Sequence, residues 1–269
     1  MPKLYDSHTH TSLCKHATGT LDEYVEVASQ QGLAGIIFTC HNPAPFGWAP
    51  HVRMSIHQLG AYIDLVQQTR ETWAGKIDVR LGLESDYVPG MEAWLTELHA
   101  SAPFDYILGS IHPYLPEYHS MYFDNDIAAF QRAYFEHLAC AAETGLFDAL
   151  SHPDVIKIVF PDIWDPLKML DDIKRCLDRI ARTGTALEVN TSGLHKPIRE
   201  LMPGPLMLEE MHKRDIPVVL GSDAHQPSHV GRDFQNALHA LADAGYTHIR
   251  VFKAHRPEDI AISTQKLVV

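Results

Sequence analysis

The stretch Lys3-Leu-Tyr-Asp-Ser-His-Thr-His10 ends a short strand-like run with two histidines. Residues i and i+2 of an extended segment point the same way, so His8 and His10 can reach the same metal ion. Similar runs recur along the chain, short and apolar and bounded by turn or polar residues, as is typical of buried parallel strands. They lie near residues 3–7, 34–39, 79–83, 106–111, 147–151, 186–190 and 217–221, with a further candidate at 248–253.

Helical patterns separate these runs. Thr20 is a candidate N-cap for the first helix, which stops at Gly32, and Ser55 opens another with a Ser-x-x-Gln capping box. The patterns span residues 21–31, 55–68, 127–144, 167–183, 205–214 and 233–244. Residues 42–54 hold three prolines and are predicted to form a loop at the mouth of the site. Strands that alternate with helices predict a parallel α/β fold.

The bulk composition narrows the class of protein. The chain has 269 residues, 45% of them hydrophobic, and a formal net charge of −12. An α/β barrel commonly reaches this length as one unit, so we expect a single domain over residues 1–269. The acidic charge disfavours nucleic acid and anionic membranes as partners. The four cysteines form no Cys-x-x-Cys pair and no run approaches a membrane span, so we expect a cytoplasmic protein with reduced thiols. No sequence feature defines an oligomeric state.

Metal-ligand residue types follow the predicted strands. All seven strands deliver a polar residue at the C-terminal end, and six deliver a ligand type, in a chain that holds 18 histidines. In a parallel barrel these ends converge on one face, where active sites lie. The nine ligand candidates are His8, His10, His16, His41, Glu84, His112, His152, Asp223 and His225.

Nine candidates exceed what one ion needs. Imidazole and carboxylate together suit Zn, Fe or Mn, so we expect two or three divalent ions, with Glu84 as a bridge. A two-metal site can ionise a bridging water and clamp the attacking and leaving oxygens. Taken singly, each residue has another interpretation: His16 could lie on the surface, and His112 and His152 could be buried core histidines. Their joint placement predicts a polynuclear metal site.

An ordered set of motifs carries a family resemblance. The motifs are Asp6-Ser-His-Thr-His10, His16, Phe38-Thr-Cys-His-Asn-Pro43, Gly82-Leu-Glu-Ser-Asp-Tyr87, Gly109-Ser-Ile-His112, Ser151-His-Pro153, Leu187-Glu-Val-Asn-Thr-Ser-Gly-Leu194 and Gly221-Ser-Asp-Ala-His225. With them the chain resembles the polymerase and histidinol phosphatase (PHP) superfamily, in its stand-alone histidinol-phosphatase branch.

The resemblance implies a distorted (β/α)7 TIM-like barrel with three metals. It implies that the first ion is held by His8, His10, Glu84 and Asp223, the second by Glu84, His112 and His152, and the third by His16, His41 and His225. Asp6 would orient a ligand histidine.

The resemblance also implies a reaction, the hydrolysis of a small phosphomonoester such as histidinol phosphate, which would belong to histidine biosynthesis. A hydroxide that bridges two ions would attack phosphorus, and Asp223 or His225 would protonate the leaving alkoxide. The chain departs from the branch at the basic residues near the site. His195 stands where the branch usually has Arg, and Lys157 lies where Arg is frequent; Arg53 is another candidate for binding phosphate.

Three other functions remain open at this point. The first is a phosphatase or phosphodiesterase that acts on another small ester, such as a nucleotide or sugar phosphate. The second is an amidohydrolase, which also opens with His-x-His but often uses a bridging lysine, whereas Glu84 is the candidate bridge here. The third is a non-catalytic, metal-stabilised binding module, which degenerate ligands would favour; none of the nine ligand positions is degenerate.

Overall fold

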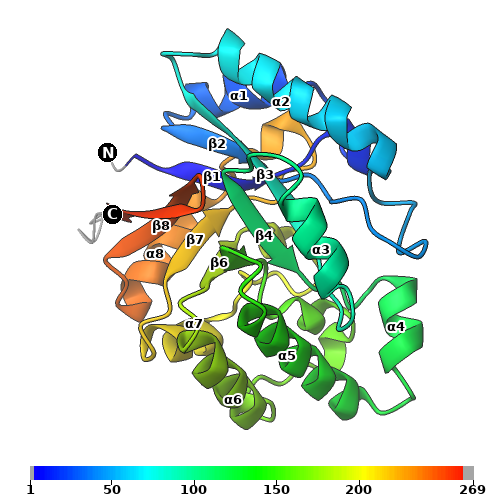
Figure 1. Cartoon of the computed structure of the whole chain (residues 1–269). Coiled ribbons are helices and arrows are strands. Elements are labelled where there is room, and N and C mark those ends of the chain that lie inside the picture. The colour runs from blue at the N-terminus through cyan, green and yellow to red at the C-terminus, as the bar shows by residue number, and fades with distance from the viewer. Residues whose placement is uncertain (1–2, 263–269) are drawn as a thin grey trace.

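Seven parallel strands follow one another in sequence order around a single sheet in the computed structural model, which describes residues 3–262 (Figure 1). Each strand pairs with the next through parallel hydrogen bonds. The strands are β1 (Tyr5–Thr9), β2 (Gly35–Phe38), β3 (Asp78–Asp86), β4 (Tyr106–Ser110), β5 (Ala149–Leu150), β6 (Ala186–Asn190) and β7 (Val218–Gly221). The predicted (β/α)7 barrel is therefore confirmed. The single domain predicted over residues 1–269 includes residues 1–2 and 263–269, which lie outside the described residues.

The barrel closes between its first and last strands at their C-terminal ends. Thr9 forms a parallel bridge with Ala224, and the backbone N of His10 donates to the carbonyl of Ala224 across 2.9 Å. The N–H of Ala224 in turn donates to the carbonyl of His8 at 3.3 Å. This closure brings the His8-Thr-His10 segment beside the segment that contains Asp223, although the two lie at opposite ends of the chain.

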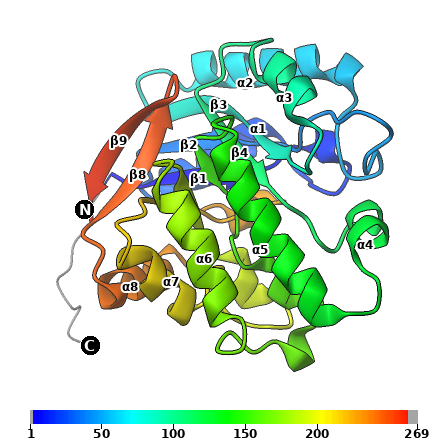
Figure 2. The same cartoon turned by 60° about the horizontal axis from the view of Figure 1, so that its bottom comes forward.

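Helices cover the outside of the barrel, with α5 and α6 side by side (Figure 2). They are α1 (Leu21–Gln30), α2 (Leu59–Thr72), α3 (Glu92–His99), α4 (Pro116–Tyr122), α5 (Ile127–Glu143), α6 (Leu170–Ala181), α7 (Pro205–His212) and α8 (Phe234–Ala244). Helix α1 begins at the predicted cap, because the Thr20 hydroxyl accepts from the Glu23 backbone N while the Glu23 carboxylate accepts from the Thr20 N. The short helices α3 and α4 were not predicted.

The predicted run at residues 248–253 is a strand, but it lies outside the barrel. Strand β8 (His248–Lys253) pairs antiparallel with β9 (Arg256–Ala261). Phe252 stacks on Tyr106 at a ring separation of 5.5 Å, within the apolar interior of the barrel. Arg80 donates to the Phe252 carbonyl across 2.7 Å. Because Tyr106 begins β4, this hairpin covers the N-terminal end of the barrel and leaves the C-terminal end for the site.

The loop at residues 42–54 has no helix or strand, as predicted. It is held at the C-terminal end of β3, because the indole N–H of Trp48 donates to Asp86 across 2.9 Å. Across the described part of the chain, the helices are all too short or too polar to cross a membrane.

Candidate metal centre

Glu84 lies at the centre of a buried group of histidines. It belongs to β3, which continues past the end of β2 and so carries the side chain to the mouth of the barrel. Glu84 Oε2 lies 3.4 Å from His8 Nε2 and 3.5 Å from His10 Nε2. Its other oxygen, Oε1, lies 3.3 Å from both His112 Nε2 and His152 Nε2. The two oxygens of one carboxylate thus face two different groups of imidazoles.

The first group has the spacing of a coordination shell. His8 Nε2 and His10 Nε2 are 3.1 Å apart, and Asp223 Oδ1 lies 3.2 Å from His10 Nε2 and 3.6 Å from His8 Nε2. Ligands held at about 2.0–2.2 Å around a tetrahedral ion are separated by roughly 3.3 Å. These three residues, with Glu84 Oε2, therefore fit one divalent ion.

The second group includes a side chain that was not predicted. The Ser110 hydroxyl donates to Glu84 Oε1 across 2.8 Å and lies 3.1 Å from His112 Nε2 and 3.4 Å from His152 Nε2. Ser110 is the last residue of β4, two positions before His112, and its side chain therefore shares a face with that histidine. The two-residue spacing of Ser110 and His112 in the sequence is therefore a signal that could have indicated this contact.

The third predicted group is only partly assembled. His16 Nδ1 donates to the Cys14 carbonyl and His225 Nδ1 to the Asp223 carbonyl, which leaves Nε2 of each ring for an ion. Their ring centroids are 4.5 Å apart. His41 lies closer to the bridge, with Nδ1 2.8 Å from Glu84 Oε2. The structure brings all nine candidates together, while their division into three sets stays a prediction.

Carboxylates outside the nine fix the orientation of two ligand rings. Glu188 Oε1 accepts from His8 Nδ1 across 2.7 Å, and Asp86 Oδ1 accepts from His112 Nδ1 across 2.9 Å. Each bond places the ring's Nε2 toward Glu84. A metal-binding histidine ordinarily gives its other N–H to such a partner, which fixes the tautomer. Glu188 and Asp86 stand in the quoted motifs, but no role was predicted for them.

The charges of the cluster favour bound cations. Burial by itself would raise the pKa of Glu84, but surrounding histidines, His8 and His112 among them, outweigh it and hold that pKa well below its usual value. Burial lowers the pKa of His41 to about 3 and that of His225 to about 2. Glu84 therefore stays ionised and these two imidazoles stay neutral, which are the forms that bind metals. Against the effect of burial, nearby carboxylates raise the pKa of His10 to about 9 and that of His112 to about 10, so a bound cation would displace a proton from these rings.

Several buried polar atoms have no hydrogen-bond partner within residues 3–262. Four of them belong to the nine candidates: Glu84 Oε2, His10 Nδ1, His41 Nδ1 and His225 Nε2. Glu84 Oε2 and His41 Nδ1 lie 2.8 Å apart but without hydrogen-bond geometry. Orphaned buried groups are costly unless something else satisfies them. Two other candidates have strained backbones, since φ is +23° at His152 and +55° at Asp223. Such strain is concentrated at functional sites. The residues present thus fit divalent ions.

Asp6 contacts the ligand segment through the backbone, and its predicted role in orienting a ligand histidine stays a prediction. Its carboxylate accepts from the backbone N–H groups of His8, Ser222 and Gly231 and from the Ser222 hydroxyl. Asp6 therefore ties the ends of β1 and β7 together through the backbone. Glu188 is the side chain that orients the His8 ring.

Two of the three residues predicted to bind phosphate are held in buried ion pairs. Arg53 is 2% exposed and donates to Asp86, to Asn42 and to a backbone carbonyl. All three ammonium protons of Lys157 are used, by Asp154, by Glu200 and by a backbone carbonyl. His195 is more exposed and is paired with Asp233 across 2.7 Å. The geometry thus favours a structural role for Arg53 and Lys157.

A seven-stranded parallel barrel with buried imidazoles and carboxylates at the C-terminal ends of its strands defines a metal-dependent hydrolase of the TIM-like barrel type. The chain belongs to the PHP domain family, whose sequence model matches residues 6–192. Asp223 and His225 lie beyond the matched residues, yet the closure of the barrel brings them to the same cluster.

Similar proteins share the length of the chain as well as the family. A protein of Deinococcus radiodurans named "Probable histidinol-phosphatase" is 41% identical over 252 residues, which cover 91% of this chain and 95% of the relative. The histidinol-phosphatase of Bacillus subtilis is 29% identical, and the aligned region covers 87% of this chain and 97% of the relative. The crystal structure of histidinol phosphate phosphatase from Lactococcus lactis, complexed with zinc, L-histidinol and phosphate, is 20% identical with a TM-score of 0.82. The superposition covers 95% of this chain and 99% of the Lactococcus lactis chain. This similarity supports the barrel fold.

Proposed function

We propose that this protein hydrolyses histidinol phosphate, a small phosphomonoester, with two to three divalent ions drawn from Zn, Fe and Mn. The observation that carries the proposal is the central position of Glu84, whose two oxygens face separate groups of imidazoles 3.3–3.5 Å away. The names of the full-length relatives supply the substrate. When bound, the ions would activate a water molecule and neutralise the phosphoryl oxygens.

The ligand sets expected from the sequence are kept as part of the proposal. They are His8, His10, Glu84 and Asp223 for the first ion, Glu84, His112 and His152 for the second, and His16, His41 and His225 for the third. The geometry supports the first set most directly, because its donor atoms already have the separations of a coordination shell.

Asp223 and His225 are the proposed catalytic residues. Their side chains are 14% and 28% exposed, whereas those of His8 and His10 are at most 1% exposed. A leaving group that approaches from the mouth therefore meets Asp223 and His225 first. Asp223 Oδ2 accepts from the Ser192 hydroxyl across 3.1 Å, which holds the ionised carboxylate in place to take a proton from the attacking water and pass it to the leaving alkoxide.

A substrate panel with the purified protein tests the proposal. Phosphate release is measured from histidinol phosphate, a nucleoside monophosphate, a sugar phosphate and a phosphodiester, each with Mn, Zn or Fe, alongside metal analysis. We expect two or more ions per chain and the highest kcat/KM for histidinol phosphate. Glu84→Gln sets the background, and His57→Gln, a change at an exposed histidine outside the cluster, is the matched control.

Each contrary result has a definite meaning. Faster turnover of a nucleotide, sugar phosphate or phosphodiester would assign the site to that ester instead. Fewer than two ions per chain, together with no release from any ester after Mn addition, would overturn the proposed activity.

A further inference from the structure

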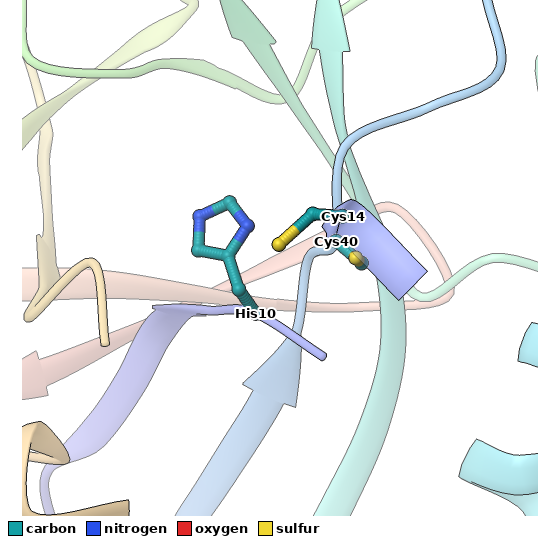
Figure 3. Close-up of side chains that lie close together, drawn as sticks. All are labelled: His10, Cys14 and Cys40. Carbon is teal, nitrogen blue, oxygen red and sulfur yellow. The ribbon is translucent and has the colours of Figure 1, made fainter. Parts of the chain in front are cut away.

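Two cysteine thiols lie against the metal centre without a part in the proposed reaction. A ring nitrogen of His10, Cys14 Sγ and Cys40 Sγ all lie within 4.8 Å of one another. Figure 3 shows the Cys14 side chain pointing toward the edge of the His10 ring, with Cys40 beside it. All three side chains are fully buried, at 0% exposure. The two thiols come from separate segments, since Cys14 ends the turn Ser12–Cys14 and Cys40 follows β2.

The two nitrogens of His10 face different surroundings. Nε2 lies 3.1 Å from His8 Nε2 and 3.2 Å from Asp223 Oδ1, in the first group of ligands. Nδ1 is on the side of the ring that faces Cys14, and it has no hydrogen-bond partner among the described residues. A ligand histidine ordinarily donates its second N–H to a carboxylate or carbonyl. His8 and His112 both do so here, whereas His10 presents that nitrogen to sulfur.

Thr11 fixes the position of the Cys40 sulfur. Its hydroxyl donates to Cys40 Sγ across 3.1 Å, and the Cys40 thiol donates to the Thr11 carbonyl across 3.6 Å. The three groups therefore offer two sulfurs and one nitrogen, a set of soft donors that differs from the imidazoles and carboxylates of the main cluster.

We propose that His10, Cys14 and Cys40 form a separate binding site for one thiophilic d10 cation, Zn2+ or Cu+, with the His10 ring shared between this cation and the first ion of the main cluster. Two sulfur ligands on a tetrahedral zinc with Zn–S bonds of about 2.3 Å lie about 3.8 Å apart, so donor atoms within 4.8 Å of one another need only small side-chain movements to reach one ion. Binding releases to solvent the two thiol protons and the Nδ1 proton of His10, whose ring then bridges the two cations as an imidazolate. The thiolate and imidazolate charges offset the added cation.

Cys14 has a second possible set of partners, and this makes Cys40 the decisive residue. Cys14 Sγ also lies within 4.8 Å of His16 and His225 ligand atoms, whereas Cys40 is not part of that group. A cation bound by Cys14 with His16 and His225 would need Cys14 alone. A cation in the proposed site needs both thiols.

Cadmium is the probe, because Cd2+ bound by thiolates gives an ultraviolet charge-transfer absorption that nitrogen and oxygen ligands do not give. The whole protein is kept reduced with a phosphine, and Cd2+ is titrated into the wild type and into Cys14→Ala and Cys40→Ala. We expect the band to saturate at one ion in the wild type and to disappear in both variants. Cys176→Ala, a change at another buried thiol, is the matched control and keeps the band.

The contrary outcomes are equally specific. Loss of the band in Cys14→Ala with full retention in Cys40→Ala would overturn the two-thiol site and assign the sulfur to the His16 and His225 group. Absence of any band in the wild type would also overturn it. Should the variants fail to fold, X-ray absorption of the zinc-loaded wild type decides, since the site requires two sulfur neighbours per bound zinc at about 2.3 Å, whereas the His16 and His225 group supplies one. Phosphatase activity is not read in any arm, so the result is independent of the proposed function.

Discussion

Glu188 Oε1 accepts a hydrogen bond from His8 Nδ1 across 2.7 Å, and both side chains are 1% exposed. Its other oxygen accepts from the backbone N of His152 at 2.8 Å and from the side-chain amide of Asn190 at 3.0 Å. One carboxylate on β6 therefore positions a ligand from β1 and another from the segment after β5. Glu188 is a positioning residue for both groups of imidazoles around Glu84.

Glu188→Gln is predicted to weaken metal binding about 10- to 100-fold while the protein still folds, the range found when a ligand's hydrogen-bond partner is changed. The glutamine carbonyl can still accept from His8, but its amide cannot accept from the His152 backbone or from Asn190. The measurement is a competition titration of Zn2+ against a chromophoric chelator. Glu136→Gln, on the outer face of α5, is the control, and equal affinity in the two variants would contradict the role of Glu188.

The barrel could be predicted from sequence because its signals are local. Each strand is a short apolar run, and Thr20 marks the start of α1 by a capping box that the structure contains. The position of β8 outside the barrel sheet could not be predicted from such local signals. Its sequence is as strand-like as the others, and only the packing of Phe252 on Tyr106 places it across the end of the barrel.

The candidate ligands were predictable for the same reason, since parallel strands end on one face whatever their order along the chain. Hydrogen-bond partners are a different matter, because they depend on register and rotamer. Asp6 and Glu188 are both buried acids within barrel strands, and nothing in the sequence indicates that Glu188 bonds to a histidine ring while Asp6 bonds to backbone N–H groups. The same holds for Arg53, because the sequence shows its positive charge but does not indicate that this charge pairs with Asp86.

Removal of metal is predicted to lower the melting temperature by on the order of 10 °C. A ligand present at a thousandfold its Kd stabilises the fold by about 4 kcal/mol, and each kcal/mol moves the Tm of a chain of this size by roughly 2–4 °C. Thermal unfolding is followed by circular dichroism with and without a chelator. Zn2+ or Mn2+ should restore the Tm, while Ca2+, which prefers oxygen ligands, should not. Identical melting curves with and without chelator would contradict the metal centre.

Asp223→Asn is predicted to lower kcat about 100-fold or more, because a positioned proton donor typically contributes 10²–10⁴-fold. The amide keeps one oxygen near His10 but cannot deliver a proton. Steady-state kinetics and metal analysis of the same preparation check this. Lost turnover with full metal content supports the proposed catalytic role, lost metal with lost turnover assigns Asp223 to binding alone, and unchanged turnover removes it from the mechanism.

Arg53→Met is predicted to reduce the free energy of unfolding by about 3–5 kcal/mol, because it removes the arginine charge paired with the buried Asp86 carboxylate. The two side chains are at most 3% exposed and their charged atoms are 2.5 Å apart. Urea unfolding measures the loss, and the double change Arg53→Met with Asp86→Asn should recover much of it. Arg175→Met, at a pair whose arginine is 67% exposed, should cost no more than about 1 kcal/mol. A raised KM for the phosphate ester at unchanged stability would instead return Arg53 to the role of phosphate ligand.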